Sequence, residues 1–319
     1  MVRADLRIAV IVTTYNSPAV LASVLEGYLA QTDHNFELFV ADDGSTSETS
    51  QVVKQFQARA TFPMHHIWQE DVGFRAAGIR NRALAATNAD YVIFTDGDCI
   101  PLTDFVATHR RLSEAGCFLS GNRMLLSQTF TKQLLDEKIP VHLWRFGDWM
   151  SARLRGQINR LLPLLRLPNF SALRKLSPKR WKGAKTCNIS AFREDLLRVN
   201  GLDESYTGWG LEDSDLVIRL IRAGLINKSA RFAAPVLHLW HKENDRSHLE
   251  ENQRRLQQVI NATHIRAFKG VDQYLLVATV QADICHLFWK GSSCQENHQS
   301  LNKLMRKYIA NKDFRLCDF

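Results

Sequence analysis

Acidic residues separated by one glycine are the first feature of this chain that could carry chemistry. Asp96 and Asp98 flank Gly97 directly after an apolar run. Two carboxylates spaced in this way can turn toward one point and hold a hard divalent cation through their oxygen atoms. Such a cation binds phosphates and neutralises charge on a leaving group. The tripeptide alone is common at strand ends, so its meaning depends on the residues that accompany it.

A second acidic pair, Asp42-Asp43, also follows an apolar run and precedes Gly44 and Ser45. A carboxylate at a strand end can accept a hydrogen bond from a nucleotide base or a ribose hydroxyl. An ordinary turn followed by a helix cap has the same composition. Taken by itself, the pair favours the ordinary turn.

Glu212 and Asp213 follow a loop in which Trp209 lies between two glycines, Gly208 and Gly210. Acids in the first turn of a helix often only complement the helix dipole. Here they end a loop able to move and close over a ligand, and an acid in that place suits a general base. Asp215 lies further into the helix, where the purely structural interpretation is stronger.

Two histidines, His238 and His241, come after an apolar run near residue 237. Neutral imidazole is a good ligand for divalent ions, so a histidine at a strand end can complete a metal site. A histidine in an apolar stretch is more often a buried core residue. The distance in sequence from His238 to the acids supports the metal interpretation.

The elements that must position these residues alternate between strand and helix along the first 120 residues. This order predicts a mostly parallel α/β sheet flanked by helices, in which ligands bind beyond the carboxyl ends of the strands. Each acidic pair of this region falls at such an end. The pattern predicts strands over 6–13, 36–41, around 67 and 91–95, and helices from 18 to 28, up to 56, and over 75–86.

The α/β pattern resumes after residue 185, with a strand over 186–190, a helix over 193–199, a loop over 201–210 and a helix over 212–223. We expect one catalytic domain over 1–249, followed by a helical extension over 250–319. Within the domain, 1–125 is the predicted nucleotide-binding half, about 130–182 a basic helical insertion, and 183–249 the half for acceptor and catalysis.

Composition limits the class of protein. The 319 residues are 45% hydrophobic and 23% charged, as in soluble globular proteins, and the apolar runs are shorter than a membrane span. We expect no signal peptide and a cytoplasmic location. The six cysteines include no C-x-x-C pair, which predicts reduced thiols without a zinc site. The net charge of +8 predicts an anionic partner: nucleic acid, a phosphate-rich ligand or an acidic membrane.

The basic insertion contains ten Lys or Arg between 145 and 182 against a single acid, Asp148, with Trp and Leu residues among them. Such a stretch can lie on the anionic surface of a membrane. Alternatively, it forms a solvated helical insertion whose apolar side packs on the domain. The sequence supports the two interpretations equally.

Five motifs together resemble a family 2 glycosyltransferase of the GT-A fold, over about residues 6 to 241. The part after 185 is similar to the galactosyltransferase-type segment that also occurs in chondroitin-type polymerases. In order, the motifs are Val12-Thr13-Thr14-Tyr15-Asn16, Asp42-Asp43-Gly44-Ser45, the segment 73–81, Asp96-Gly97-Asp98, and Gly208-Trp209-Gly210-Leu211-Glu212-Asp213.

The resemblance implies a role for each matched residue. Asp98, Asp96 and His238 would hold a divalent metal, Mn²⁺ or Mg²⁺, and Asp213 would be the catalytic base beside Glu212, which would bind a sugar. The residues implied in binding the nucleotide-sugar donor, with UDP expected, are Thr14, Tyr15, Asn16, Asp42, Asp43, Arg75, Arg80, Asp96 and Trp209.

The resemblance also implies the reaction: transfer of a hexosyl or N-acetylhexosaminyl group to a glycan or lipid-linked acceptor of surface polysaccharide or lipopolysaccharide synthesis. Retaining relatives with a similar loop carry Asn in place of Asp213, so Asp213 favours inversion. The alternatives are a retaining transferase, a nucleotidyltransferase, and a catalytically silent protein that binds nucleic acid or sugar nucleotides. Nucleic-acid binding is not expected, because no recognition motif accompanies the charge.

Overall fold

The structure is a computed structural model that describes residues 5–166, 171–243 and 245–275. The chain divides into two compact units, residues 1–272 and 273–319, and the architecture below is that of the first.

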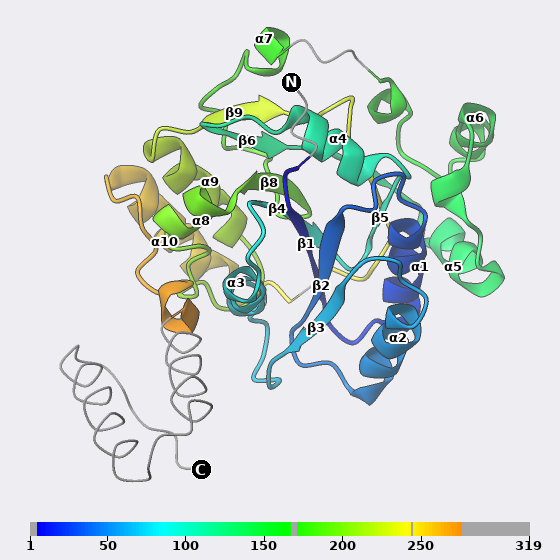
Figure 1. The fold of residues 1–319 in the computed structure, drawn as a ribbon, viewed down its shortest axis with the longest axis horizontal. Coiled ribbons are helices and arrows are strands. Elements are labelled where there is room, and N and C mark those ends of the chain that lie inside the picture. The colour runs from blue at the N-terminus through cyan, green and yellow to red at the C-terminus, as the bar shows by residue number, and fades with distance from the viewer. Residues whose placement is uncertain (1–4, 167–170, 244, 276–319) are drawn as a thin grey trace. The chain divides into compact units, whose positions relative to one another are not determined.

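A mixed α/β arrangement surrounds one seven-stranded sheet with the strand order β3-β2-β1-β4-β8-β6-β9 (Figure 1). Pairs among β1 to β4 are parallel, whereas β8 runs antiparallel to both β4 and β6. The mostly parallel sheet predicted from the alternation is therefore confirmed. Its strands are β1 (Ile8–Thr14), β2 (Phe36–Asp42), β3 (Met64–Trp68), β4 (Tyr91–Asp96), β6 (Cys117–Ser120), β8 (Asn188–Phe192) and β9 (Ile226–Ser229).

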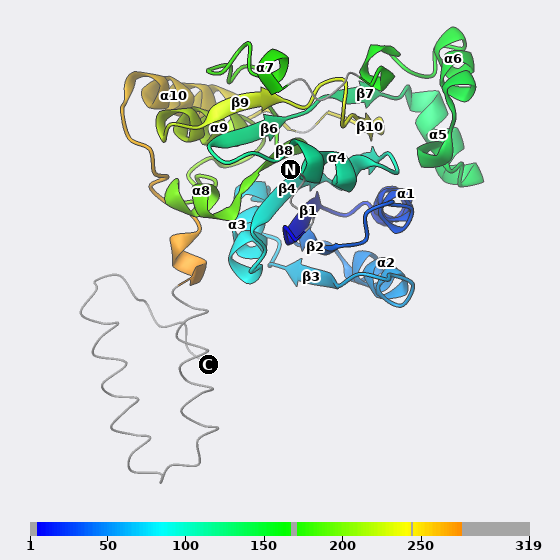
Figure 2. The same cartoon turned by 45° about the horizontal axis from the view of Figure 1, so that its top comes forward.

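The central strands are apolar on both faces because helices cover both. Helices α1 and α2 lie on one side of β1 to β3, and α3 lies on the other (Figures 1 and 2). Ile8, Val10 and Val12 of β1 are almost fully buried. The helices that follow the strands are α1 (Pro18–Leu29), α2 (Ser47–Gln57), α3 (Ala76–Ala86), α4 (Phe105–Leu112), α8 (Arg193–Arg198) and α9 (Glu212–Arg222).

A second, three-stranded sheet with the order β5-β10-β7 joins segments far apart in the chain. Its strands are β5 (Cys99–Pro101), β7 (Arg123–Leu125) and β10 (Val236–His238). The register pairs His238 with Cys99, and the Leu239 N–H donates to the Asp98 carbonyl at 2.9 Å. This sheet therefore carries the histidine segment to the end of the Asp96-Gly97-Asp98 turn.

The expected basic insertion is composed of short helices joined by turns. Trp149, Ala152 and Ile158 are buried in the main core, so the inner side of the insertion packs on the domain. Its elements are α5 (Gln128–Glu137), the 3-10 turns η1 (Val141–Leu143) and η2 (Leu162–Leu164), α6 (Phe146–Leu154) and α7 (Ser171–Arg174).

Helix α10 (Leu249–Asn261) packs on α9, and Leu256 and Val259 of α10 form an apolar cluster with Ile218. The first compact unit continues through Asp272, so it extends past residue 249, where the sequence interpretation ends the catalytic domain. The reason is physical: α10 has an apolar side that the sequence interpretation assigned no partner. Residues 276–319 of the expected extension lie outside the described residues.

Among the described residues, no helix combines the length and the apolar character that crossing a membrane would require.

Candidate active site

The ends of three neighbouring parallel strands meet at one edge of the main sheet. The strand register pairs Thr14 of β1 with Asp42 of β2, and Thr13 with Asp96 of β4. The expectation that these polar clusters gather at the carboxyl ends of adjacent strands is confirmed. This edge is where α/β sheets of this kind bind ligands.

Asp43 is held by donors from the β3–α3 segment. Its carboxylate accepts hydrogen bonds from the Arg75 backbone N–H at 2.7 Å and from Gln69 Nε2 at 2.5 Å. Burial raises the pKa of Asp43. Sequence reasoning missed Gln69, because an isolated glutamine carries no motif that could mark it.

Asp42 differs from Asp43 because it is fully buried, and each of its carboxylate oxygens has a protein partner. Oδ1 accepts from the Ser45 N–H at 2.8 Å, and Oδ2 lies 2.9 Å from His66 Nε2. In this structure Asp42 shapes the turn that contains Gly44, whose φ of +97° favours glycine. These contacts support the interpretation of Asp42 as a turn residue.

Tyr15 and Asn16 form the loop after β1. The Tyr15 ring is about half exposed, and its hydroxyl donates to Asp71 at 2.8 Å. Asn16 has a left-handed backbone, with φ of +42°, and its Oδ1 accepts from the Thr46 N–H at 2.9 Å. An asparagine tolerates this conformation better than most residues. The loop is therefore tied to the turn after β2 and leaves the tyrosine face open.

Arg80 joins the strand ends to the acidic pair of α9. This buried guanidinium donates to Thr13 Oγ1 at 2.9 Å, to Asp96 Oδ1 at 2.8 Å and to Glu212 Oε1 at 3.3 Å. Burial raises the pKa of both Asp96 and Glu212. Carboxylates 116 residues apart, the difference between 212 and 96, are thereby part of one site.

Asp213 has a different set of close partners from Glu212. Its Oδ1 accepts from the Ser214 N–H at 2.7 Å, while its Oδ2 lies 3.7 Å from Lys185 Nζ, beyond hydrogen-bond distance. Asp215, two residues on, forms a buried ion pair with Arg219 at 2.7 Å. The structural interpretation of Asp215 is confirmed, whereas the cation nearest to Asp213 Oδ2 is Lys185, at 3.7 Å.

The loop before α9 is held by α10. The buried Asn252 side chain donates to the carbonyls of Thr207 at 3.0 Å and Gly210 at 3.1 Å. A Cβ on Gly208, whose φ is +67°, would come within 2.8 Å of the His248 ring. The backbone of Leu211, with φ of +78°, is also left-handed, a strained state for a leucine. Sequence reasoning missed Asn252, which lies outside every motif.

Trp209 is partly exposed, and the Arg246 guanidinium lies 5.3 Å from the centre of its ring. Arg75 donates from its guanidinium to the Glu70 carbonyl at 2.5 Å and stays partly exposed. These two residues thus lie at the surface of the site, unlike Arg80.

Asp98 and two histidines form a group with the chemistry of a metal site. Asp98 Oδ2 lies 3.5 Å from His238 Nε2 and 3.3 Å from His241 Nε2, and the three ligand atoms lie within 4.8 Å of one another. Burial lowers the pKa of His238, which favours the neutral imidazole that binds metals. His241 was noted in the sequence beside His238, but only His238 was assigned to the metal.

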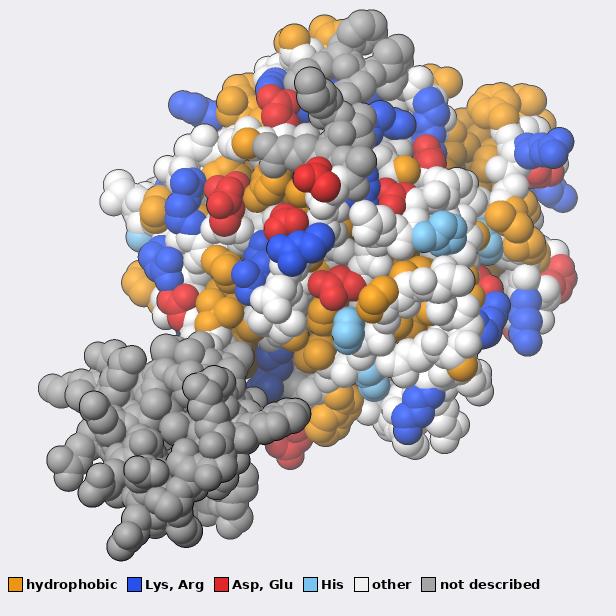
Figure 3. Space-filling model, in the orientation of Figure 1, with side chains coloured by type: hydrophobic (Ala, Val, Ile, Leu, Met, Phe, Trp, Pro, Cys, Tyr) orange, Lys and Arg blue, Asp and Glu red, His pale blue; other side chains and the backbone are white. Residues whose placement is uncertain are grey.

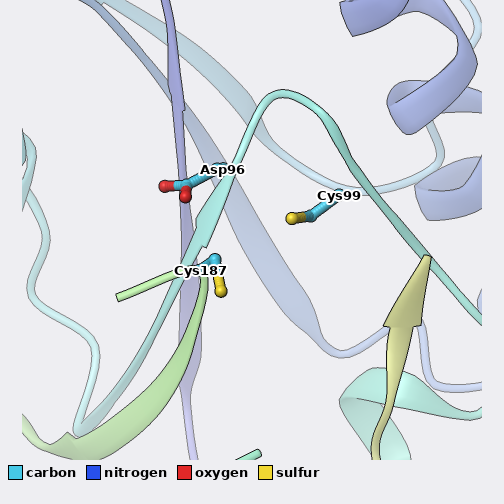
Figure 4. A group of neighbouring side chains, drawn as sticks. All are labelled: Asp96, Cys99 and Cys187. Atoms are coloured by element: carbon cyan, nitrogen blue, oxygen red, sulfur yellow. The ribbon is translucent and has the colours of Figure 1, made fainter. Parts of the chain in front are cut away.

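A second group of possible metal ligands consists of Asp96, Cys99 and Cys187 (Figure 4). Both thiols are buried and free, and burial raises the pKa of Cys99 well above its ordinary value. A thiol must lose its proton to bind a metal, and the raised pKa of Cys99 opposes this loss. Of the two groups, the Asp98 group fits a hard or borderline divalent ion better.

Comparison with known proteins identifies the family. The family model described as glycosyl transferase family 2 matches residues 9–157, and that described as the N-terminal domain of galactosyltransferase matches 170–242. Validoxylamine A glucosyltransferase of Streptomyces hygroscopicus subsp. jinggangensis is 31% identical over 68% of this chain and 52% of its own length. Chondroitin synthase of Escherichia coli is 26% identical over 71% of this chain and 34% of its own.

The chain thus spans about half of the first relative and about a third of the second. Two solved structures share the fold at 16% identity. The mannosyltransferase of Pyrobaculum calidifontis, in complex with GDP-Man and Mn²⁺, matches with a TM-score of 0.54 over 95% of this chain and 81% of its own. S. aureus TarS 1–349, in complex with UDP-GlcNAc, matches with a TM-score of 0.55 over 85% and 70%. The two family models match the segments that form the sheet and the candidate site, and the two solved structures share the fold. This chain therefore belongs to glycosyl transferase family 2 and has the GT-A fold.

Proposed function

We propose that this protein transfers a hexosyl or N-acetylhexosaminyl group from a nucleotide-sugar donor to a hydroxyl of a saccharide acceptor. The observation that carries the proposal is the Arg80 network. Because Arg80 bonds to Thr13, Asp96 and Glu212, the strand ends that suit a nucleotide and the acids that suit an acceptor belong to one site.

The donor half of the proposal assigns the nucleotide to the carboxyl ends of β1, β2 and β4. The exposed Tyr15 ring and the Asp43 carboxylate offer a stacking face and a hydrogen-bond acceptor there. The two structural neighbours hold different nucleotides, GDP in one and UDP in the other, so their shared support is for a nucleotide sugar. UDP is the proposed nucleotide on the motif resemblance. The other proposed contacts are Thr14, Asn16, Arg75 and Trp209.

Asp98, His238 and His241 are the proposed ligands of a divalent metal. A set with two imidazoles and one carboxylate suits Mn²⁺ better than Mg²⁺, which prefers oxygen atoms alone. Such an ion neutralises negative charge on the diphosphate when bound. Asp96 is held by Arg80 at 2.8 Å, so its proposed role is to orient the turn and contact the ribose.

Asp213 is the proposed base. An acceptor hydroxyl loses its proton as the new C–O bond forms, and a carboxylate in contact with that hydroxyl assists this step. Asp213 Oδ2 suits this role because its nearest cation, Lys185 Nζ, is 3.7 Å away, whereas Glu212 is held by Arg80. A base on the face opposite the leaving diphosphate produces one in-line displacement and inversion at the anomeric carbon.

Calorimetric titration with UDP in Mn²⁺ and in EDTA tests the donor and metal parts, with Asp98→Ala as the variant. Asp104→Ala is the matched control, since Asp104 pairs with Arg166 at the surface. We expect UDP binding that needs Mn²⁺, is lost in Asp98→Ala and is retained in Asp104→Ala. Binding of equal strength in EDTA would contradict the metal role. Absence of UDP binding under both conditions would contradict the UDP assignment.

The configuration of the product tests the base. Proton NMR of the first product formed from an α-linked UDP-sugar should show a β-linkage. An α-linked product would establish the retaining alternative instead and remove Asp213 from the role of base.

We further propose that the acceptor belongs to surface polysaccharide or lipopolysaccharide synthesis and is reached at the inner face of the membrane. The support comes from α6, which exposes Phe146, Met150 and Leu154 at a spacing of four residues while Trp149 faces the core. Exposed Arg153 lies on the same helix. Hydrophobic and basic side chains gather over α5 and α6 in Figure 3. Such a helix suits an anionic lipid surface.

Cosedimentation with neutral and with anionic vesicles tests this membrane contact. The matched pair is Leu154→Ser and Phe268→Ser, because these side chains are 84% and 81% exposed. We expect salt-sensitive binding to anionic vesicles that Leu154→Ser weakens by about threefold or more and Phe268→Ser leaves unchanged. Equal binding to both kinds of vesicle, or an equal loss in both variants, would contradict the proposal.

A further inference from the structure

A cavity of about 180 Å³ lies between the segment after α7 and the end of β9. Four cationic residues line it: Arg174, Arg180, Lys182 and Arg231. Three of them belong to the basic stretch of the sequence, but Arg231 comes from a segment about 50 residues later in the chain. The fold therefore gathers cations that the sequence keeps apart.

The described lining of this cavity carries positive charge. Among the described residues that line it, none is Asp or Glu. Glu114, the acid on the neighbouring strand connection, bonds instead to Lys175 and to Lys228 Nζ, the latter at 3.0 Å. Burial, together with the nearby Arg180 and Arg160, lowers the pKa of Arg231. Cations in this state bind an anion favourably, since the anion removes their mutual repulsion.

The cavity has a fixed frame. Arg174 is 7% exposed and donates to the carbonyls of Ser229 at 3.0 Å and Arg231 at 2.9 Å. Asn227 donates to the Arg180 carbonyl at 2.5 Å, and its Oδ1 accepts from Ser120 at 2.7 Å. These bonds tie the segment after α7 to β6 and β9. The cavity is thus built by the domain and does not depend on surface side chains alone.

Its position relates it to the acceptor side of the active site. Gly183 and Ala184 line the cavity, and the next residue, Lys185, lies 3.7 Å from Asp213. Leu173 and Leu176, which also line the cavity, are 62% and 76% exposed. On one side, an anionic group in the cavity would therefore lie next to the chain segment that leads to Lys185 and the proposed base. On the other side, it would lie next to the exposed Leu173 and Leu176.

We propose that this cavity binds a phosphate ester carried by the acceptor. The assignment to the acceptor rests on the proposed function, whereas phosphate binding itself does not. Two sources share this chemistry: a phosphorylated saccharide, and a lipid phosphate whose chain would lie on Leu173 and Leu176. Arginine is suited to both because its guanidinium binds two phosphate oxygens at once.

The test is calorimetric titration of the protein with UDP and Mn²⁺ present at saturation, so that the donor site is occupied. The probes are glucose 6-phosphate and short-chain dihexanoyl phosphatidic acid. The variant is Arg180→Ala/Arg231→Ala, and the matched control is Lys54→Ala/Arg254→Ala, which removes the same charge at two exposed positions outside the cavity and the insertion. Arg180→Gln/Lys182→Gln, at two exposed positions, repeats the test if the first variant does not fold.

We expect at least one probe to bind, about tenfold more weakly in the cavity variant, with the control and UDP affinity within about twofold of the parent protein. If the lipid probe binds more tightly than the sugar phosphate, and Leu173→Ser/Leu176→Ser removes that difference, the ligand is a lipid phosphate. If the sugar phosphate binds as tightly as the lipid probe, the ligand is a phosphorylated saccharide. An equal loss in variant and control, or no binding of either probe, would overturn the proposal. Failure of the proposed function is distinct, because UDP itself would then not bind.

Discussion

Polar side chains in the loops after β1 and β2 have different partners, at different distances, from those of the acidic side chains around α9. In the loops, carboxylates and amides accept from backbone N–H groups at 2.7–2.9 Å, as with Ser45 to Asp42 and Arg75 to Asp43. Glu212, Asp213 and Asp98 instead face charged or titratable side chains at 3.3–3.7 Å. Asp215 of α9, whose ion pair with Arg219 is at 2.7 Å, is an exception.

This difference separates scaffold from reacting groups. Short bonds to backbone amides fix the shape of a loop and leave little freedom in the side chain. Longer contacts between charges leave oxygen atoms that a ligand, a metal or an acceptor hydroxyl can take over. Substitutions in the loops should therefore affect stability first, and substitutions around α9 should affect turnover first.

Asp213→Asn provides the largest expected effect. The variant keeps the bond to the Ser214 N–H, because its amide oxygen can still accept, but it cannot take a proton. We expect kcat to fall by about 10²- to 10⁴-fold, with UDP affinity and melting temperature unchanged. Steady-state kinetics and calorimetry measure the two quantities. A kcat within threefold of the parent protein would remove Asp213 from catalysis.

Asp42→Ala tests the loop side of the comparison. The substitution leaves the Ser45 N–H without its acceptor and removes the contact of Asp42 with His66. We expect the free energy of unfolding to fall by about 2–3 kcal/mol. Urea unfolding measures it, with Asp98→Ala as the control that loses metal binding while keeping its stability. A stable Asp42→Ala protein that had lost UDP affinity would reverse the two roles.

His109 provides a stability effect that belongs to neither region. Burial lowers its pKa to about 3, and its Nδ1 lies 2.8 Å from Ser190 Oγ. The unfolded chain, with an ordinary histidine pKa near 6.5, binds a proton that the folded protein excludes. The contribution of His109 to the free energy of unfolding is therefore complete above pH 6.5. It is lost at about 1.4 kcal/mol per pH unit as the pH falls toward 3.

The measurement is urea unfolding of the parent protein and His109→Phe between pH 7.5 and 4.5. Phenylalanine keeps the ring beside Phe105, and the Ser190 hydroxyl keeps Tyr91 as a partner. The carboxylates contribute equally to both proteins, so the difference reports His109. Two curves with the same slope against pH would show that His109 titrates in the folded state.

Asn252→Ala has the smallest expected effect and tests whether α10 positions the loop before α9. The variant lacks the Asn252 amide that donates to the Thr207 and Gly210 carbonyls, so the loop gains freedom. We expect kcat/KM for the acceptor to fall by about fivefold, with UDP affinity within twofold of the parent value. Asn261→Ala, at an exposed position of the same helix, is the control. Equal losses in donor and acceptor parameters would indicate general destabilisation.

The local pattern of the chain determined the architecture of the first half. Alternating apolar runs and helix signals predicted the strands β1 to β4 and their mostly parallel pairing, and parallel topology then required Thr14, Asp42 and Asp96 to meet at one edge. These residues could be predicted because each lies next to the strand that positions it. The motif order was also sufficient to recognise the family.

Only the tertiary structure decided which side chains complete the site. Gln69, Lys185, His241 and Asn252 reach it through contacts between segments that no local pattern connects. The cluster of Arg231 with the insertion, and the contact of Asp42 with His66 of β3, likewise depend on how distant elements pack. Strand and helix periodicities report which face of an element is buried, whereas the partner buried against that face is set by the fold as a whole.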